Sequence, residues 1–409
     1  MFAPRDSSHS PQDDASTPAI ARVGIIGGGQ LAWMMAPGAR KLNLQLVVQT
    51  PKVDDPAVVI ASETVLAPVA DAAATAKLAS HCDVITFENE FIDLLALKAL
   101  AAQNVRFYPQ LSSLEPLLDK AEQRAYCQSL GLPTPKFVSL SLKPGEKPDS
   151  KAIKTAISHL GTPVVLKTCR HGYDGQGTFI LHSPAEVEAT WQKLGCQPIL
   201  LEAFVPFERE LAVMVARSQT GDVVTYPVVE TQQIDQICRR VIAPAQVTDA
   251  VKTAVESMAR SLMESLNVVG IFGIELFLTA DGQVLINEIA PRTHNSGHYS
   301  LDACKTSQFE QQLRAVSGLP LESPTMTCRA AVMVNLLGYE TSTDDYVDKR
   351  LQLEQLPNSH VYWYGKTEAR PGRKLGHVTV LLDGDTEKES GAVQDAIACI
   401  ESIWYSEFA

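Results

Sequence analysis

Residues 271–298 read IFGIELFLTADGQVLINEIAPRTHNSGH, and the fold that we expect is inferred mainly from this segment. Two apolar runs flank Asp281-Gly282, a dipeptide that strongly indicates a two-residue hairpin turn. In a hairpin centred on that turn, Glu275 and Glu288 pair directly, with Cβ atoms about 4.5–5.5 Å apart. Like charges at that distance destabilise a sheet unless a cation lies between them. The pairing predicts either a divalent-cation site or two carboxylates that face water on an edge hairpin.

The residues around the second carboxylate favour the cation. Asn287 precedes Glu288, and a set of oxygen ligands of this kind suits Mg²⁺. Arg292 and His294 follow within the segment APRTHNSGH. A histidine beside an arginine and a carboxylate cluster can bind an anion or move a proton, although a lone histidine is more often structural.

The composition indicates an ordinary globular protein. The chain has 409 residues, 45% of them hydrophobic and 20% charged, which is enough for two to four domains. A net charge of −12 argues against a general nucleic-acid surface. Eight scattered cysteines without a CxxC pair predict reduced thiols in a cytosol, and no apolar run is long enough to predict a membrane span. Residues 1–20 are rich in Ser, Pro and Asp, which predicts a disordered tail and not a signal peptide.

A glycine-rich turn opens the ordered part of the chain. Gly27, Gly29 and Ala32 follow the strand VGII and fit the pattern G-x-G-x-x-A. A dinucleotide site also requires an acidic residue about 20 positions later, where this chain reads VVQTP. We therefore disfavour a nicotinamide cofactor. A turn that packs a strand on a helix, or that holds another phosphate-bearing ligand, fits better.

A second glycine-rich segment, RHGYDGQGT at residues 170–178, joins two apolar strands. Backbone amides in such a loop can cradle phosphate oxygens, and Lys167 on the preceding strand is placed to reach a phosphate. The alternative is a plain hairpin loop. The segment YWYGKTEARPGRK at residues 362–374 is basic and glycine-rich, with Lys366 and Arg373 suited to a phosphate monoester or, alternatively, to a surface loop.

The order of these features resembles the ATP-grasp superfamily, in which two α+β lobes hold ATP. The strings GIIGGGQLAWM, DVITFENE, NEIAPRTHNSGH and YGKTEARPGRKLGH are similar to those of the N5-carboxyaminoimidazole ribonucleotide synthases, over about residues 21–385. The resemblance implies α/β plus α+β architecture. Its parts are a Rossmann-like domain at 21–117, an ATP-grasp domain at 118–320 with a phosphate-loop lobe at about 166–206, and a small, mostly-β domain at 321–409.

The resemblance also implies ATP-dependent carboxylation of 5-aminoimidazole ribonucleotide by bicarbonate, through carboxyphosphate, in purine biosynthesis. It implies a cytoplasmic homodimer that binds two Mg²⁺ ions through Glu275 and Glu288 and has no nucleic-acid or membrane partner. Arg292, His294 and Lys366 are the implied catalytic residues. The implied ATP-binding residues are Lys120, Lys167, Gly172, Tyr173, Asp174, Gly175, Gln176, Gly177, Glu202, Ala203, Phe204, Val205, Glu210, Gln233, Asn287 and Glu288. The implied substrate-binding residues are Gln30, Leu31, Glu88, Tyr173, Arg292, Lys366 and Arg373.

Two departures from the family pattern and several rival functions stay open. Family members often carry a histidine where this chain has Gln233, which cannot carry a proton near neutral pH. The string FENE leaves open whether Glu88 or Glu90 faces the ligand. The rivals are another ATP-grasp ligase, such as a formate-using glycinamide ribonucleotide transformylase, and a non-catalytic nucleotide-binding protein.

Overall fold

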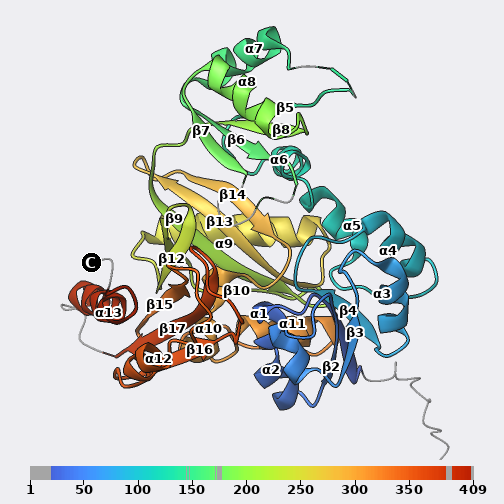
Figure 1. Cartoon of the computed structure of the whole chain (residues 1–409), viewed down its shortest axis with the longest axis vertical. Coiled ribbons are helices and arrows are strands. Elements are labelled where there is room, and N and C mark those ends of the chain that lie inside the picture. The colour runs from blue at the N-terminus through green and yellow to red at the C-terminus, as the bar shows by residue number, and fades with distance from the viewer. Residues whose placement is uncertain are drawn as a thin grey trace, which may run out of the picture.

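The computed structural model describes residues 20–406, apart from 144, 147, 171, 173–176 and 384–388. The predicted tail therefore lies outside the described residues except at Ile20, and so do Tyr173, Asp174, Gly175 and Gln176. In Figure 1 a small upper lobe stands above a wider body, whose N-terminal part (blue) and C-terminal part (red) lie at opposite sides.

The N-terminal part is a parallel sheet with the strand order β3-β2-β1-β4. Its strands are β1 (Arg22–Ile26), β2 (Gln45–Thr50), β3 (Glu63–Leu66) and β4 (Val84–Phe87). The helices of this part are α1 (Gln30–Trp33), α2 (Ala36–Lys41), η1 (Pro56–Ile60), α3 (Ala72–Ala79), α4 (Leu94–Ala101), α5 (Leu111–Leu114) and η2 (Glu115–Leu117). Asp71 and Asp93 cap α3 and α4, since each side chain accepts a backbone N–H three residues later. The Rossmann-like architecture that the resemblance implied for this part of the chain is confirmed.

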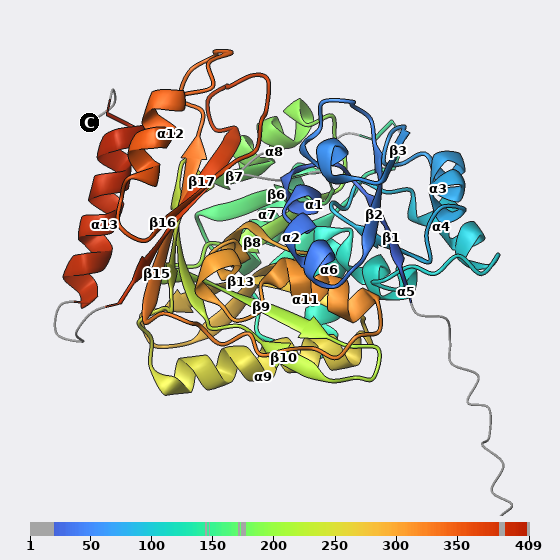
Figure 2. The ribbon, with the colours of Figure 1, turned by 90° about the horizontal axis from the view of Figure 1, so that it is seen from below.

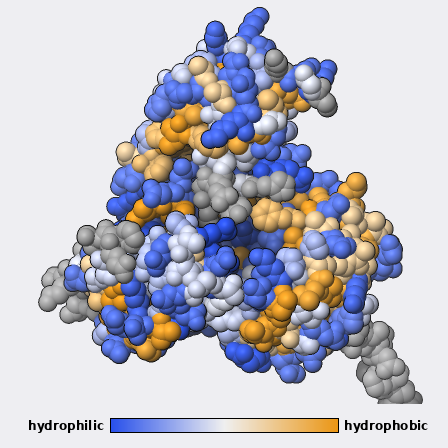
Figure 3. All heavy atoms as spheres, in the orientation of Figure 1, coloured by the Kyte–Doolittle hydropathy of each residue, from blue (hydrophilic) through white to orange (hydrophobic). Residues whose placement is uncertain are grey.

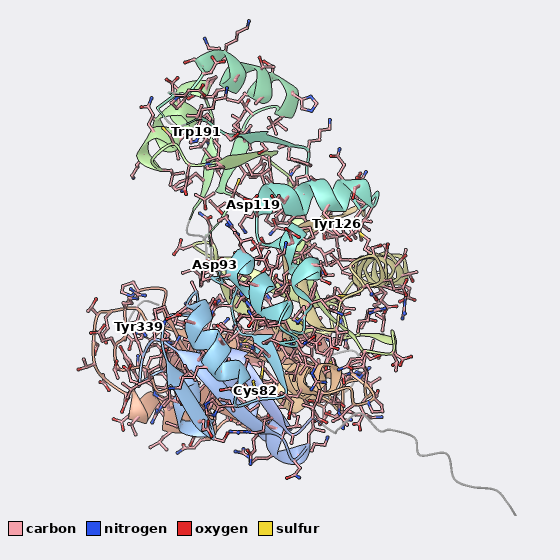
Figure 4. All side chains as sticks on the ribbon, turned by 90° about the vertical axis from the view of Figure 1, so that its right-hand side faces the viewer. Cys82, Asp93, Asp119, Tyr126, Trp191 and Tyr339 are labelled. Carbon is pink, nitrogen blue, oxygen red and sulfur yellow. The ribbon has the colours of Figure 1, made fainter. Side chains whose placement is uncertain are left out.

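The upper lobe is an antiparallel sheet in the order β5-β8-β6-β7, which α7 and α8 cover on its outer face (Figure 1). Its elements are β5 (Phe137–Leu140), α7 (Ser150–Leu160), β6 (Val164–Thr168), β7 (Thr178–Leu181), α8 (Pro184–Lys193) and β8 (Ile199–Ala203). Trp191 of α8 is buried between helix and sheet (Figure 4). Helix α6 (Lys120–Ser129) lies below this lobe and is capped by Asp119, which accepts the N–H groups of Ala121 and Glu122.

The central sheet has nine strands in the described part of the chain, in the order β14-β13-β9-β11-β12-β15-β17-β16 with β10 paired to β9. The strands are β9 (Phe207–Arg217), β10 (Val223–Thr225), β11 (Val229–Ile234), β12 (Ile237–Ala243), β13 (Gly270–Thr279), β14 (Val284–Ala290), β15 (Ala330–Leu337), β16 (Ser359–Trp363) and β17 (Lys374–Leu382). Because β12 pairs with β15, this one sheet contains strands from both sides of the domain boundary expected at residues 320 and 321.

Helices cover both faces of the central sheet (Figure 2). They are α9 (Asp249–Ser265), η3 (Asn295–Gly297), α10 (Ser300–Ala303), α11 (Gln308–Val316), α12 (Val347–Glu354) and α13 (Glu389–Trp404). Helix α9 packs on β9 and β14, whereas α11 packs on β13 and on α2 of the N-terminal part. Residues 298–318 contain two helices, α10 and α11. No helix among the described residues is long and apolar enough to span a bilayer.

The turn between β13 and β14 is one residue longer than predicted. Leu278 pairs with Val284, and the Gly282 N–H donates to the Thr279 carbonyl oxygen at 2.9 Å. Gly282 has a φ of +82°, in the left-handed region where glycine is favoured. The two-residue turn is therefore wrong: the loop has three residues and ends on a left-handed glycine, a common hairpin geometry.

A bulge in β14 restores the pairing that the sequence predicted. Leu276 pairs with Ile286 but Glu275 pairs with Glu288, so Asn287 is one extra residue in β14. Successive side chains of a regular strand point to opposite faces. The bulge breaks this alternation, and Asn287 and Glu288 consequently both lie beside Glu275.

Candidate active site

A cleft of about 990 Å³ lies where the upper lobe, the central sheet and the N-terminal part meet. In Figure 3 the surface is hollowed below the upper lobe, and hydrophilic residues are visible within the hollow. Many of the predicted site residues line this cleft: Gln30, Leu31, Glu88, Lys120, Lys167, Gly172, Glu202, Ala203, Phe204, Val205, Glu210, Gln233, Glu275, Asn287, Glu288, Arg292 and His294. Segments that are far apart in the chain thus come together at one place.

The wall below the upper lobe holds a buried group of charges. Lys167 Nζ lies 2.8 Å from Oε2 of Glu202 and donates to Oδ1 of Asn287 at 2.9 Å. Arg124 Nε binds the other oxygen of Glu202, and a second Arg124 nitrogen donates to the carbonyl oxygen of Asn287. Burial alone would raise the pKa of Glu202, but the two cations lower it. Glu202 is therefore an ionised link between β8, β6 and α6.

Helix α6 places three side chains against the edge strand β14. Lys120, Gln123 and Arg124 are three and four residues apart, which puts them on one face of the helix. The carboxamide of Gln123 accepts the Ile289 N–H at 2.9 Å and donates to the Ile289 carbonyl oxygen at 3.0 Å. The helix thus satisfies backbone groups that an edge strand would otherwise leave unpaired.

Glu275 and Glu288 form the floor of the cleft. Lys120 Nζ lies 2.6 Å from Oε1 of Glu288, and Asn287 Nδ2 donates to Oε2 of Glu275 at 3.4 Å. Burial and the neighbouring Glu288 carboxylate raise the pKa of Glu275 to about 7. Burial opposes ionisation of Glu288 as well, but Lys120 lowers its pKa. Two facing carboxylates supply the negative charge and the oxygen ligands that a divalent cation requires, and a bound cation would favour ionisation of Glu275 despite its raised pKa.

Glu210 lies on β9 close to this pair. Burial raises its pKa to about 7, while Lys167 and a hydrogen bond from Gln233 act in the opposite direction. Opposite Gln232 and Gln233 the pairing skips Arg239, which marks a bulge in β12 at this point. Gln233 therefore supports a carboxylate that faces the cleft.

Arg292 follows β14 and meets the N-terminal part of the chain. Its Nε lies 2.8 Å from Oε1 of Glu90, and Nη2 donates to Oε2 of the same carboxylate at 3.2 Å. Glu88, two residues earlier, accepts the backbone N–H groups of Gly29 and Leu31, and burial raises its pKa. Both carboxylates line the cleft, one bound to a helix start and the other to Arg292.

The first glycine-rich turn makes room for Glu88. A Cβ on Gly29 would lie 2.3 Å from Glu88 Oε1, and one on Gly27 would lie 2.6 Å from Oε2. The amides at the start of α1 hence bind a carboxylate of the chain itself, where a dinucleotide fold would present them to a pyrophosphate.

His294 lies over the carboxylate pair, with Nε2 3.6 Å from Oε1 of Glu275 and Nδ1 2.9 Å from the Ser296 hydroxyl. Gly273 lets it approach, since a Cβ there would lie 2.5 Å from Cβ of His294. His298, four residues on, is fully buried, and burial holds its pKa well below the usual value. These two histidines of the segment therefore differ: one faces the carboxylates and the other stays neutral.

The basic C-terminal segment reaches the cleft through Lys374. Lys366 Nζ donates to the Lys374 carbonyl oxygen at 2.7 Å and lies 5.4 Å from the centre of the Tyr364 ring. Arg373 donates to the Glu368 carbonyl oxygen at 2.6 Å.

In the second glycine-rich loop, Gly177 lies against Thr168. The backbone N–H of Thr168 donates to the Gly177 carbonyl oxygen at 2.9 Å.

Sequence reasoning missed Gln123 and Arg124, and it included Lys374 only as one residue of the basic segment 362–374. The spacing of Lys120, Gln123 and Arg124 within DKAEQR carried a signal, because it places all three on one helical face. Lys374 stood in the basic segment without a pattern that separated it from Arg373.

Three family models match successive parts of the chain. They are the ribonucleotide synthetase preATP-grasp domain over residues 20–116, the ATP-grasp domain over 125–309 and the phosphoribosylaminoimidazole carboxylase C-terminal domain over 331–390.

Similar proteins match over nearly the whole length. The N5-carboxyaminoimidazole ribonucleotide synthase of Synechococcus elongatus is 55% identical over 386 residues, which are 94% of this chain and 96% of that protein. The crystal structure of the Aspergillus clavatus enzyme complexed with ATP aligns with a TM-score of 0.85 at 32% identity, over 94% of this chain and 99% of that one. A structure of the synthase from the same organism with ADP and 5-aminoimidazole ribonucleotide aligns with a TM-score of 0.84 at 31% identity, over 93% and 98%.

Proposed function

The chain belongs to the N5-carboxyaminoimidazole ribonucleotide synthases, as its sequence predicted, and we propose that it carboxylates 5-aminoimidazole ribonucleotide with bicarbonate and ATP. It is an ATP-dependent ligase of purine biosynthesis with the ATP-grasp fold. The observation that carries the proposed reaction is the facing pair Glu275 and Glu288 in one cleft with Lys120, Lys167 and Arg292.

The ATP phosphates would lie between the upper lobe and the carboxylate pair. Lys167 and Lys120 supply positive charge on two sides of this space, and both already contact carboxylates that help to hold them in place. The adenine would lie against residues 203–205, where backbone groups follow the end of β8, and Glu210 would bind the ribose. The two lysines stabilise negative charge as a phosphoryl group transfers.

Glu275 and Glu288 would hold Mg²⁺, two ions in our proposal, with Asn287 beside them. Magnesium on the phosphates neutralises charge and orients the transferring group. The residues of the chain prepare this site, because the bulge at Asn287 brings three oxygen-bearing side chains of the hairpin together, those of Glu275, Asn287 and Glu288.

Bicarbonate is a poor electrophile, so it requires activation. Its oxygen attacks the γ-phosphorus of ATP, ADP leaves, and carboxyphosphate forms. The exocyclic amine then attacks the carboxyl carbon, or the CO2 released from it, and inorganic phosphate departs. Arg292 would hold the carboxyphosphate, and His294 would lie at the reacting carboxyl group and amine. A cleft that excludes water protects this intermediate from hydrolysis.

The nucleotide substrate would bind between the N-terminal part and the basic C-terminal segment. Glu88, Gln30 and Leu31 line one side of the cleft. Lys366 and Arg373 would bind the phosphate of the ribonucleotide, with Lys374 nearer to the reacting centre. We further propose a cytoplasmic location, which the free cysteines among the described residues favour. The family resemblance is the basis for proposing a homodimer.

The test is ADP release by the purified protein with Mg–ATP and bicarbonate, with and without 5-aminoimidazole ribonucleotide. Release that depends on this nucleotide supports the proposed reaction. Release that responds instead to glycinamide ribonucleotide and formate would assign a sister ligase. No release with any of these substrates would favour a non-catalytic nucleotide-binding protein. Arg292→Ala is expected to abolish carboxylation, and normal turnover by this variant would overturn its assigned role.

A further inference from the structure

All three guanidinium nitrogens of Arg292 lie close to oxygen atoms of the chain, and two of them, Nη1 and Nη2, donate hydrogen bonds among the described residues. Nε and Nη2 meet the two oxygens of Glu90 at 2.8 and 3.2 Å, and Nη1 donates to the Thr293 carbonyl oxygen at 3.1 Å. The Glu90 carboxylate thus occupies the Nε–Nη2 edge of the guanidinium, and an edge of this kind can bind a planar oxyanion through two parallel N–H groups. Any further oxyanion that binds this edge has to displace Glu90.

The carboxylate belongs to a different part of the fold from its arginine. Glu90 lies after β4 of the N-terminal part, and Arg292 lies after β14 of the central sheet. Both line the cleft, with 26% and 20% of their side chains exposed. Glu88 is fixed by the amides of Gly29 and Leu31, so it stays where it is when Glu90 moves.

We propose that Glu90 competes with the reacting oxyanion for Arg292, and that this competition sets the affinity of the cleft for bicarbonate and for the carboxyl end of carboxyphosphate. The proposal rests on the proposed function, which assigns that oxyanion to Arg292. Chemically the exchange is close to balanced, because the Glu90 carboxylate and the incoming oxyanion each present a planar pair of oxygen atoms to the same guanidinium. The released Glu90 side chain can be hydrated at the cleft.

The competition has a consequence for specificity. A small oxyanion that offers Arg292 only two hydrogen bonds gains little over Glu90. An oxyanion that is also held by other groups of the cleft, such as His294 or a bound cation, gains more and displaces the carboxylate. Glu90 therefore selects for an oxyanion that lies in the reacting position.

The experiment compares wild type with Glu90→Gln and Glu90→Asp. Glutamine keeps the size of the side chain but loses its charge, and aspartate keeps the charge but loses reach. Glu115→Gln is the matched control, since Glu115 also lines the cleft but pairs with Lys98 at 2.6 Å on an exposed site. Each full-length protein is saturated with Mg–ADP, and binding of ¹³C-bicarbonate is followed by the broadening of its ¹³C resonance.

We expect Glu90→Gln to bind bicarbonate at least threefold more tightly than wild type, Glu90→Asp to lie between them and Glu115→Gln to match wild type. Mg–ADP affinity that equals wild type shows that a variant is folded. The proposed competition is refuted if neither Glu90 variant binds bicarbonate more tightly than wild type does. Absence of detectable binding in both variants counts as the same outcome.

A separate assay keeps this inference distinct from the proposed function. Wild-type ADP release that depends on 5-aminoimidazole ribonucleotide tests the reaction itself. If that dependence is missing while Glu90→Gln binds bicarbonate more tightly, only the proposed reaction fails. If the dependence is present while the affinities are equal, only the competition fails.

Discussion

Glu275 and Glu288 lie directly opposite each other on β13 and β14. Lys120 forms an ion pair with Glu288, its Nζ lying 2.6 Å from Oε1 of that carboxylate. Burial and the carboxylate of Glu288 raise the pKa of Glu275 to about 7. The chain thus maintains a charge arrangement that opposes folding at neutral pH. A cation between the two carboxylates would turn the same arrangement into a binding site.

Glu275→Gln is expected to stabilise the metal-free protein while abolishing activity. A carboxyl group with a raised pKa lowers the free energy of unfolding as pH rises from about 4.5 to 7, because the unfolded chain releases its proton first. The gain in the variant should therefore be about 1–3 kcal/mol above pH 7 and small near pH 4.5. Urea unfolding in EDTA at both values measures it. Glu256→Gln on the exposed side of α9 is the control, and no gain at pH 8 would contradict the prediction.

The central hairpin illustrates how far the sequence leads. Alternating apolar residues and Asp281-Gly282 identified the two strands and the facing carboxylates. The turn length was wrong and the bulge at Asn287 was not foreseen; these two one-residue errors cancel in the final register. A bulge depends on tertiary contacts, which here are the hydrogen bonds that Lys167 and Arg124 make to Asn287. No local sequence pattern predicts such contacts.

The site was predictable where its residues lie in compact motifs. Lys167, Arg292 and the carboxylate pair were identified from their motifs and Glu202 from the resemblance alone, and all of them line one cleft. The contacts that organise the site join distant positions, such as Arg124 with Glu202, 78 residues apart, and Arg292 with Glu90, 202 residues apart. Pairings of this kind follow from how the parts of the fold meet, which residue spacing does not encode.

Arg124→Met is expected to destabilise the protein strongly. Arg124 and Glu202 have side chains that are only 2% and 3% exposed, and removing one partner leaves a buried charge less well compensated. Such a loss costs about 3–5 kcal/mol, reduced here by the remaining contact with Lys167. Urea unfolding at pH 7 measures the change. Arg260→Met, whose partner Glu264 is half exposed, is the matched control and should cost less than about 1 kcal/mol. Equal effects would refute the importance of burial.

Gly29→Ala is expected to displace the Glu88 carboxylate. The added Cβ would lie 2.3 Å from Glu88 Oε1, so the carboxylate has to leave the amides that it accepts from. Overpacking of this kind costs about 1–3 kcal/mol, and the KM for the nucleotide substrate should rise while that for ATP stays constant. Gly391→Ala is the control, because nothing lies within 4 Å of its added Cβ. In helix α13 it should instead stabilise the protein by about 1 kcal/mol. An unchanged KM in Gly29→Ala would show that Glu88 does not serve the substrate.

His377 is expected to make the protein sensitive to acid. It is fully buried, its Nδ1 lies 2.8 Å from the Tyr364 hydroxyl, and burial lowers its pKa to about 3. The unfolded chain binds a proton at this position below about pH 6.5, whereas the folded chain does not until about pH 3. The free energy of unfolding should consequently fall as pH drops through this window, by up to about 1.4 kcal/mol per pH unit for this group. Urea unfolding between pH 7 and 4.5 should show a shallower dependence for His377→Gln, because glutamine keeps a partner for Tyr364 and does not titrate. His159→Gln, exposed on α7, should keep the wild-type slope. If His377→Gln also keeps it, burial of this imidazole is not what weakens the fold in acid.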